Sequence, residues 1–326
     1  MGQGDIDEIA NRTGFSGVVW IDRAGQIEFA KAYGLANRAY AVPNTLDTRF
    51  GIASGSKGFT ALAVFSLVRE GVLDLSTTAR SLLGNDLPLI ADDVTVEHLL
   101  THTSGIGDYL DEEADSEITD YFVGAAHELT TTEAFLPLLD GHPTKFRAGE
   151  RFSYCNGGFV VLALLAERAG GIGYHDLVRE RVLRPAGMTR TEFLRSDELP
   201  ADVAVGYLPL DGKDRSNVFH LPVLANGDGG IHTTAADIST FWRALFAGDI
   251  VDHVEEVVRP RCDVPDQSRR YGLGFWLHET TDTAMLVGYD AGASFQSTHD
   301  PRTGTTRTVL SNTSPGAWPI ARALMS

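Results

Sequence analysis

The chain has 326 residues, of which 43% are hydrophobic and 22% are charged, a composition typical of a globular protein. Its 44 acidic residues outnumber its 27 basic residues and give a net charge of −17. This surplus opposes binding to nucleic acid or anionic membranes, because both require clustered lysine and arginine. The two cysteines, Cys155 and Cys262, are too few for a disulfide framework or a metal cluster.

The sequence also bears on membranes and location. No run of about 18 apolar residues occurs, so a membrane-spanning helix is not predicted. The first residues are acidic and lack the basic segment and the apolar stretch of a signal peptide. For the sequence as written we therefore expect a cytoplasmic protein, with an oligomeric state that the sequence leaves open.

Strand patterns gather at the two ends of the chain. Residues 16–22 and 26–33 are rich in β-forming residues and predict a hairpin with its turn at residues 23–25. The remaining strand patterns lie near the C-terminus, over residues 272–278, 284–288, 294–298 and 305–311. A last helix is predicted over residues 319–325.

The middle of the chain has mainly helical periodicity, over residues 57–70, 96–101, 132–139, 159–169 and 235–246. Strands at both ends around a helical middle predict an α+β fold, in which one antiparallel sheet built from both termini is flanked by helices. We expect residues 1–326 to form one catalytic unit. A mainly helical subdomain would occupy roughly 75–230, and residues 1–74 and 231–326 would form the sheet subdomain.

Ser54 and Lys57 are the first candidate catalytic residues. They lie one helical turn apart at the start of a helix that is apolar on nearly every face, so the hydroxyl and the amine share one side. Apolar surroundings should lower the pKa of the amine, because desolvation disfavours the ammonium form, and such an amine can take a proton from serine. The alternative is that Ser54 caps the helix while Lys57 extends its amine to water.

Tyr154 and Asn156 form a second pair, just before another apolar helix. Alternation directs both side chains to one side and Cys155 to the other. A phenol can relay protons if a neighbouring ammonium lowers its pKa, and a carboxamide can hold both an amine and a substrate carbonyl. The alternative is a helix-capping Asn156 beside a core Tyr154.

Together, and in this order, the Ser-x-x-Lys and Tyr-x-Asn motifs resemble those of the serine β-lactamase and penicillin-binding-protein superfamily. The branch most similar contains class C β-lactamases, D-alanyl-D-alanine carboxypeptidases and family VIII esterases. Further segments similar to this family lie at residues 50–60, 94–105, 185–188 and 229–237. The resemblance implies a β-lactamase/transpeptidase-like fold, with Ser54 as nucleophile, Lys57 and Tyr154 as general acid and base, and Asn156 positioning the substrate.

The third signature of that family, Lys-Thr-Gly or His-x-Gly, should fall near residues 288–295, where neither lysine nor histidine is present. Tyr289 can substitute as a hydrogen-bond donor, whereas Asp290 would repel a substrate carboxylate if it faces the cleft. The backbone N–H groups of Ala291, Gly292 or Ala293 are candidates to join that of Ser54 in an oxyanion hole.

Other patterns favour structural roles. His98 and His102 have the spacing of metal ligands on a helix, but a third ligand is not patterned near them. The glycine-rich residues 226–231 lack the ending of a phosphate loop and predict a turn lining the site, before a capping pair of Thr234 and Asp237. The acidic residues 111–117 predict a solvated loop at the edge of the cleft. We expect neither a metal nor another cofactor.

The leading hypothesis is a serine hydrolase that forms an acyl-enzyme on Ser54 and acts on a small ester, amide or peptide, with weak or no β-lactamase activity. Esterase, D-peptidase and β-lactamase reactions all suit this scaffold, since a fold does not dictate function. The rival hypothesis is a non-catalytic member of the fold that binds a ligand or a partner, and its support is the altered third signature.

Overall fold

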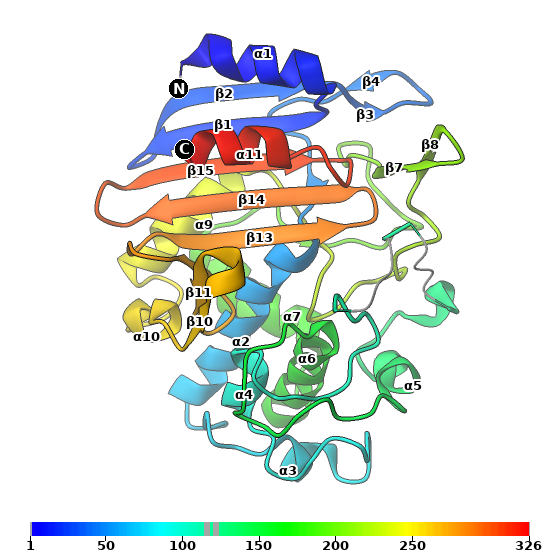
Figure 1. Ribbon diagram of the computed structural model, residues 1–326, viewed down its shortest axis with the longest axis vertical. Helices are drawn as coiled ribbons and strands as arrows, with labels where there is room; N and C mark the ends of the chain where they lie inside the picture. Colours follow the sequence, from blue (N-terminus) through cyan, green and yellow to red (C-terminus); the bar gives the residue numbers. More distant parts are fainter. Residues whose placement is uncertain (1, 114–117, 120–123, 326) are drawn as a thin grey trace.

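The computed structural model describes residues 2–113, 118–119 and 124–325 (Figure 1). Its strands are β1 Gly17–Arg23, β2 Gln26–Tyr33, β3 Leu35–Asn37, β4 Val42–Pro43, β5 Phe50–Gly51, β6 Glu192–Phe193, β7 Tyr207–Leu210, β8 Lys213–Ser216, β9 Ile231–Thr233, β10 Cys262–Val264, β11 Arg269–Tyr271, β12 Trp276–His278, β13 Ala284–Asp290, β14 Ala293–Asp300 and β15 Thr305–Ser311. Its α-helices are α1 Gln3–Thr13, α2 Lys57–Arg69, α3 Ala79–Leu83, α4 Val96–Leu100, α5 Leu136–Leu139, α6 Asn156–Gly170, α7 Tyr174–Val178, α8 Arg184–Ala186, α9 Ala235–Ala247, α10 Val254–Val258 and α11 Trp318–Met325.

The main sheet joins the two ends of the chain. It has eight strands in the order β10-β11-β12-β13-β14-β15-β1-β2, and its neighbours pair antiparallel. The N-terminal hairpin meets the C-terminal strands where β1 pairs with β15, with Gly17 opposite Ser311. The terminal helices α1 and α11 cover one face of this sheet, and α9 packs on the other (Figure 1). The predicted α+β fold, with its sheet built from both termini, is confirmed.

Two layers of apolar side chains hold the sheet in place. On the inner face, Trp242 of α9 is fully buried, and its ring N–H donates to the Ser297 hydroxyl at 2.8 Å. On the outer face, α1 and α11 bury a smaller cluster that includes Ile6, Val19 and Ile320. The sheet is therefore covered on both faces, and its central strands β14 and β15 bury polar side chains as well, among them Ser297, Thr306 and Thr308.

Several predicted boundaries were wrong. Residues 272–278 do not form one strand, because Gly274 has a φ of +78° and the chain turns there between β11 and β12. A Cβ at Gly274 would lie 2.3 Å from the Cβ of Ala61, so α2 packs directly against this turn. The sequence analysis missed α1 and β10, and it predicted one helix over residues 132–139 where the structure has a 3₁₀ turn, Glu133–Phe135, and the short α5.

The segment at roughly 75–230 carries α3 to α8 and also the short strands β6, β7 and β8. Its separation as a subdomain from residues 1–74 and 231–326 stays a prediction.

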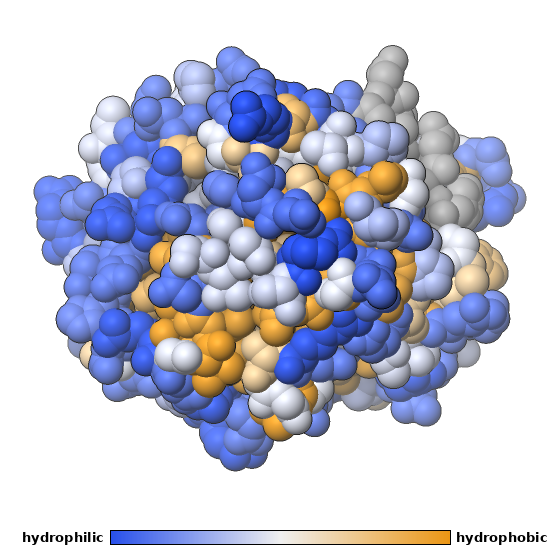
Figure 2. All heavy atoms as spheres, turned by 90° about the horizontal axis from the view of Figure 1, so that it is seen from below, coloured by the Kyte–Doolittle hydropathy of each residue, from blue (hydrophilic) through white to orange (hydrophobic). Residues whose placement is uncertain are grey.

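Seen from the end that carries α3, the surface is mainly hydrophilic with apolar areas between the polar ones (Figure 2). Among the described helices, none is both long and apolar enough to cross a membrane.

Candidate active site

Ser54 lies in a tight 3₁₀ turn, Ala53–Ser56, that joins β5 to α2. The regular helix starts at Lys57, so the prediction that Ser54 opens it was wrong by one turn. Ala53 has a φ of +46°, a conformation that costs a residue with a side chain free energy. At Gly55 a Cβ would lie 2.5 Å from the Phe295 ring, so only glycine lets the turn pack this closely on β14. The strained, tightly packed turn fixes the position of Ser54.

Lys57 is buried beside Ser54, with only 1% of its surface exposed. Its Nζ donates to Ser54 Oγ at 3.0 Å, to Asn156 Oδ1 at 2.8 Å and to the Asp228 carbonyl oxygen at 2.8 Å. The alternative in which this lysine extends to water is therefore wrong. Burial lowers the pKa of Lys57, as expected from the sequence, although nearby carboxylates oppose the shift, namely Asp228, Glu112, Asp108 and Asp290.

Tyr154 lies over the same amine, with its ring centroid 4.9 Å from Lys57 Nζ. Burial raises the pKa of Tyr154 well above its ordinary value, and the charge of Glu112 raises it further. A hydrogen bond with Ser54 lowers this pKa only in part. The sequence hypothesis of a phenol with a lowered pKa therefore has the wrong direction, and Tyr154 keeps its proton.

Asn156 is the first residue of α6, and its side chain faces the cavity while Cys155 points into the core, as alternation predicted. The helix begins at residue 156, three residues before the predicted start at 159, because a residue from a distant part of the chain caps its first turn. The Asp108 carboxylate accepts the N–H groups of Asn156 at 2.5 Å and Gly157 at 2.8 Å. Asn156 Nδ2 donates to the Leu110 carbonyl at 2.9 Å, which directs its Oδ1 to Lys57.

The β13–β14 hairpin forms the opposite wall. Asp290 lines the cavity, so the condition under which it would repel a carboxylate is met, and Tyr289 lines the rim with 46% of its surface exposed. The backbone N–H of Ala291 donates to Asp290 Oδ1 at 2.7 Å, and that of Gly292 donates to Ser314 Oγ at 2.8 Å. Both groups thus make hydrogen bonds within the protein, and their part in an oxyanion hole stays a prediction.

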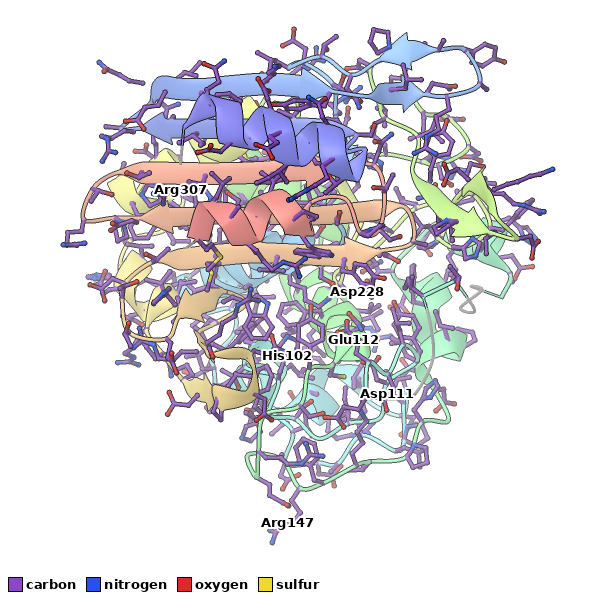
Figure 3. All side chains as sticks on the ribbon, turned by 45° about the horizontal axis from the view of Figure 1, so that its top comes forward. His102, Asp111, Glu112, Arg147, Asp228 and Arg307 are labelled. Carbon is purple, nitrogen blue, oxygen red and sulfur yellow. The ribbon has the colours of Figure 1, made fainter. Side chains whose placement is uncertain are left out.

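A cavity of about 330 Å³ opens beside Ser54. Its apolar wall includes Leu194, Leu199, Leu221 and Pro222, and its carboxylates are Asp111, Glu112, Asp228 and Asp290. The described residues that line it include no arginine or lysine. Figure 3 shows Asp228 and Glu112 below the edge of the main sheet. The cavity thus combines apolar side chains with four carboxyl groups.

The loop of residues 226–231 lines the cavity as predicted, and α2 and the turn before it hold the loop at both ends. Thr60 Oγ1 donates to the Gly227 carbonyl at 2.6 Å, and Ser56 Oγ accepts the N–H of Ile231 at 3.0 Å. The predicted cap that follows is also present, since the Thr234 side chain accepts the N–H of Asp237.

Sequence reasoning missed three residues that complete the site. Asp108 caps α6, Tyr109 donates its hydroxyl to the Asp228 carboxylate, and Asp228 accepts from Lys57 through its carbonyl. These contacts link segments that are 48 to 171 residues apart, so no local pattern marks them. Of the acidic residues 111–117, Asp111 pairs with Lys145 at 2.6 Å, whereas residues 114–117 lie outside the described part.

The histidines of the metal alternative are engaged within the protein. His98 Nδ1 accepts the N–H of Thr95 as part of the cap of α4, and His102 contacts the aromatic residues around Tyr154. Within the described residues, no three histidine, cysteine, aspartate or glutamate side chains are grouped closely enough to hold a metal ion.

The sequence and the fold are both similar to those of known proteins. Residues 4–325 match the family described as beta-lactamase. The chain belongs to this family. The crystal structure of a penicillin-binding protein from Bacillus halodurans superposes with a TM-score of 0.90 at 34% identity, covering 98% of this chain and 99% of that one.

Two relatives come from the sequence comparison. Esterase EstB of Burkholderia gladioli is 34% identical over 303 residues, 83% of this chain and 76% of that protein. Penicillin-binding protein 4* of Bacillus subtilis is 26% identical over 305 residues, 88% of this chain but only 65% of that protein. The chain thus spans less than two thirds of the length of the latter relative.

The electrostatics of Asp290 predict a pH-dependent effect on stability. Burial raises the pKa of Asp290 to about 7. Near pH 8 the carboxyl group is therefore ionised in both the folded and the unfolded protein, but its ionisation costs free energy only in the folded protein. Asp290→Asn should therefore raise the melting temperature at about pH 8. At about pH 3, below the ordinary aspartate pKa, the group is neutral in both states and the gain should vanish.

Thermal unfolding at the two pH values measures this difference, with the exposed Asp282→Asn as the matched control. A gain of equal size at both pH values would show that the charge of Asp290 is not its cause.

Proposed function

We propose that this protein is a serine hydrolase that forms an acyl-enzyme on Ser54. The observation that carries the proposal is the contact of 3.0 Å between the Ser54 hydroxyl and a buried lysine amine. A serine hydroxyl is a weak nucleophile until an adjacent base takes its proton, and this contact lies within the reach of that transfer.

Lys57 is the proposed base. An ammonium group has three N–H donors, whereas a neutral amine has two and a lone pair. The carbonyl oxygens of Asn156 and Asp228 can only accept, so they retain the two N–H bonds when Lys57 is neutral. The lone pair is then directed at Ser54 Oγ. The lowered pKa of Lys57 favours this neutral form, and the Asn156 and Asp228 contacts orient it.

The reaction then follows from these positions. The Ser54 proton passes to Lys57 as Oγ forms a bond to the substrate carbonyl carbon, and the carbonyl electrons move onto oxygen. When the tetrahedral intermediate collapses, the bond to the alcohol or amine breaks, and the leaving group takes a proton from the Lys57 ammonium, either directly or through Tyr154, which gives up its own proton and regains one from Lys57. Water then hydrolyses the acyl-serine and releases the acid. Tyr154 can serve as a donor because its raised pKa keeps it protonated.

The cavity supports a small, uncharged or cationic ester, amide or peptide as the substrate. Its lining combines apolar side chains with the carboxyl groups of Glu112, Asp228 and Asp290. A carboxylate-bearing substrate would meet these charges without an arginine or lysine among the described lining residues. The name of the related esterase EstB supports esters, and β-lactams, which carry a carboxylate, fit this cavity less well.

A protein that only binds a ligand on this fold remains the rival. Its support was the altered third signature at Tyr289 and Asp290. Against it stands the buried Lys57, whose hydrogen-bond partners among the described residues are a hydroxyl and two carbonyl oxygens rather than a carboxylate. Burial of an amine without a paired charge costs free energy that a purely structural core would avoid. A fluorophosphonate probe separates the two, since only an activated serine reacts with it.

The nucleophile is tested by paired serine variants. Ser54→Ala should lower kcat for p-nitrophenyl butyrate by roughly 10⁴-fold or more, because it removes the hydroxyl that the Lys57 amine contacts. Ser56→Ala is the matched control, since that side chain is buried and accepts the N–H of Ile231. The control should lose stability but still carry the probe on Ser54. Probe mass on Ser56 after peptide digestion, or full activity in Ser54→Ala, would overturn the assignment.

The pH profile tests the base. Because neutral Lys57 accepts the proton, kcat/KM should rise with pH through a midpoint below the ordinary lysine pKa of about 10.4. No alkaline loss should come from Tyr154 near pH 10, since its pKa is raised. Lys57→Arg should lose about 10²–10⁴-fold in kcat, because guanidinium cannot accept a proton at these pH values. An active Lys57→Arg enzyme would exclude this base.

Substrate charge gives the third comparison. We expect kcat/KM for p-nitrophenyl butyrate to exceed that for nitrocefin, because the described residues that line the cavity include Asp290 but no lysine or arginine to pair with the nitrocefin carboxylate. Asp290→Asn should reduce the ratio of the two kcat/KM values, because it removes about 1 kcal/mol of repulsion between Asp290 and the nitrocefin carboxylate, roughly fivefold in rate. If nitrocefin is the better substrate, or if Asp290→Asn raises that ratio, the charge of the cavity does not select the substrate.

A further inference from the structure

His102 lies directly behind the candidate active site and takes no part in the reaction proposed above. It is 1% exposed, and its backbone has a φ of +56°, which is strained for histidine. Figure 3 shows it below the sheet, at the level of Glu112. A residue keeps such a strained backbone conformation only when its contacts with the surrounding structure stabilise it.

Those contacts converge on the segment that carries Tyr154 and Asn156. The backbone carbonyl of His102 accepts the N–H of Ser153 at 2.9 Å, and its ring Nδ1 accepts the N–H of Cys155 at 3.1 Å. The imidazole also lies against the Tyr154 ring, with 4.3 Å between centroids and 34° between planes. One residue thus holds the backbone on both sides of Tyr154 and supports its ring.

The protonation state of the imidazole follows from its partners. An N–H can only donate, so Nδ1 must be the unprotonated nitrogen, and Nε2 carries the proton toward the Tyr271 hydroxyl at 3.1 Å. Burial, with a smaller effect of the Lys57 charge, holds the pKa of His102 well below its ordinary value. A neutral ring with this tautomer is the form that can accept from Cys155.

We infer that His102 is a positioning residue that sets the place of Tyr154 and Asn156 relative to Lys57, through the acceptor at Nδ1. This inference rests on the proposed function. Tyr154 lies 4.9 Å above the Lys57 amine and Asn156 Oδ1 lies 2.8 Å from it, so both depend on where the Ser153–Asn156 backbone runs. A displacement of about 1 Å in such groups can cost about 100-fold in rate.

Three substitutions separate this role from simple packing. In His102→Asn the side-chain oxygen occupies the place of Nδ1, two bonds beyond Cβ, and asparagine tolerates a positive φ. In His102→Gln the amide lies one bond further out, near Nε2. In His102→Phe the ring remains, but the acceptor is lost. Tyr271→Phe is the matched control, because it removes only the partner of Nε2.

We expect His102→Phe and His102→Gln to lower kcat for p-nitrophenyl butyrate by about 100-fold, with KM within about threefold of the wild type. His102→Asn should recover activity to within about tenfold, and Tyr271→Phe should stay within about threefold. The rate of fluorophosphonate labelling of Ser54 should follow kcat. Thermal unfolding of each variant identifies any loss that comes from misfolding.

The outcomes distinguish the two proposals. If the wild type neither hydrolyses the ester nor labels at Ser54, the proposed function fails. If the wild type is active but His102→Asn and His102→Gln are equally active or equally impaired, the acceptor at Nδ1 does not set the site, and the inference about His102 fails. This comparison decides the question even if His102→Phe does not fold.

Discussion

The structure depends on one buried amine. Lys57 is removed from water at the centre of the molecule, and a lysine in that position is costly unless it loses its charge or gains hydrogen bonds. Here both occur, because burial lowers its pKa and Ser54, Asn156 and Asp228 supply acceptors around it. The rest of the fold can be understood as what brings these acceptors to one point.

Each acceptor comes from a different part of the chain. Ser54 is fixed by a strained turn against β14, Asn156 by a helix start capped from Asp108, and the carbonyl of Asp228 by a loop that Thr60 and Ser56 hold. The sheet closes the arrangement, since its eight strands join both termini and place β13 beside the serine turn. Three segments that are far apart in the sequence therefore meet at the Lys57 amine, and contacts to neighbouring elements fix the position of each one.

Local chemistry made much of this predictable. The spacing of Ser54 and Lys57 gave their contact, alternation gave the direction of Asn156, and β-rich runs at both ends gave the sheet. Tertiary contacts decided the remainder. The start of α6 depends on Asp108, 48 residues before Asn156, and the N–H of Gly292 donates to Ser314, 22 residues later in the chain. The pKa of Tyr154 moves opposite to expectation because burial and the charge of Glu112 raise it more than the hydrogen bond with Ser54 lowers it.

The most direct test of the account is the titration of Lys57 itself. The chain has only four lysines, Lys31, Lys57, Lys145 and Lys213, so ¹³C-labelled lysine gives few resonances, and Lys57→Arg assigns the one of interest. The account predicts that the Lys57 signal titrates at a lower pH than the other three, because its amine is buried. A Lys57 signal that titrates together with the other lysines, or above them, would contradict the neutral amine as the base that activates Ser54.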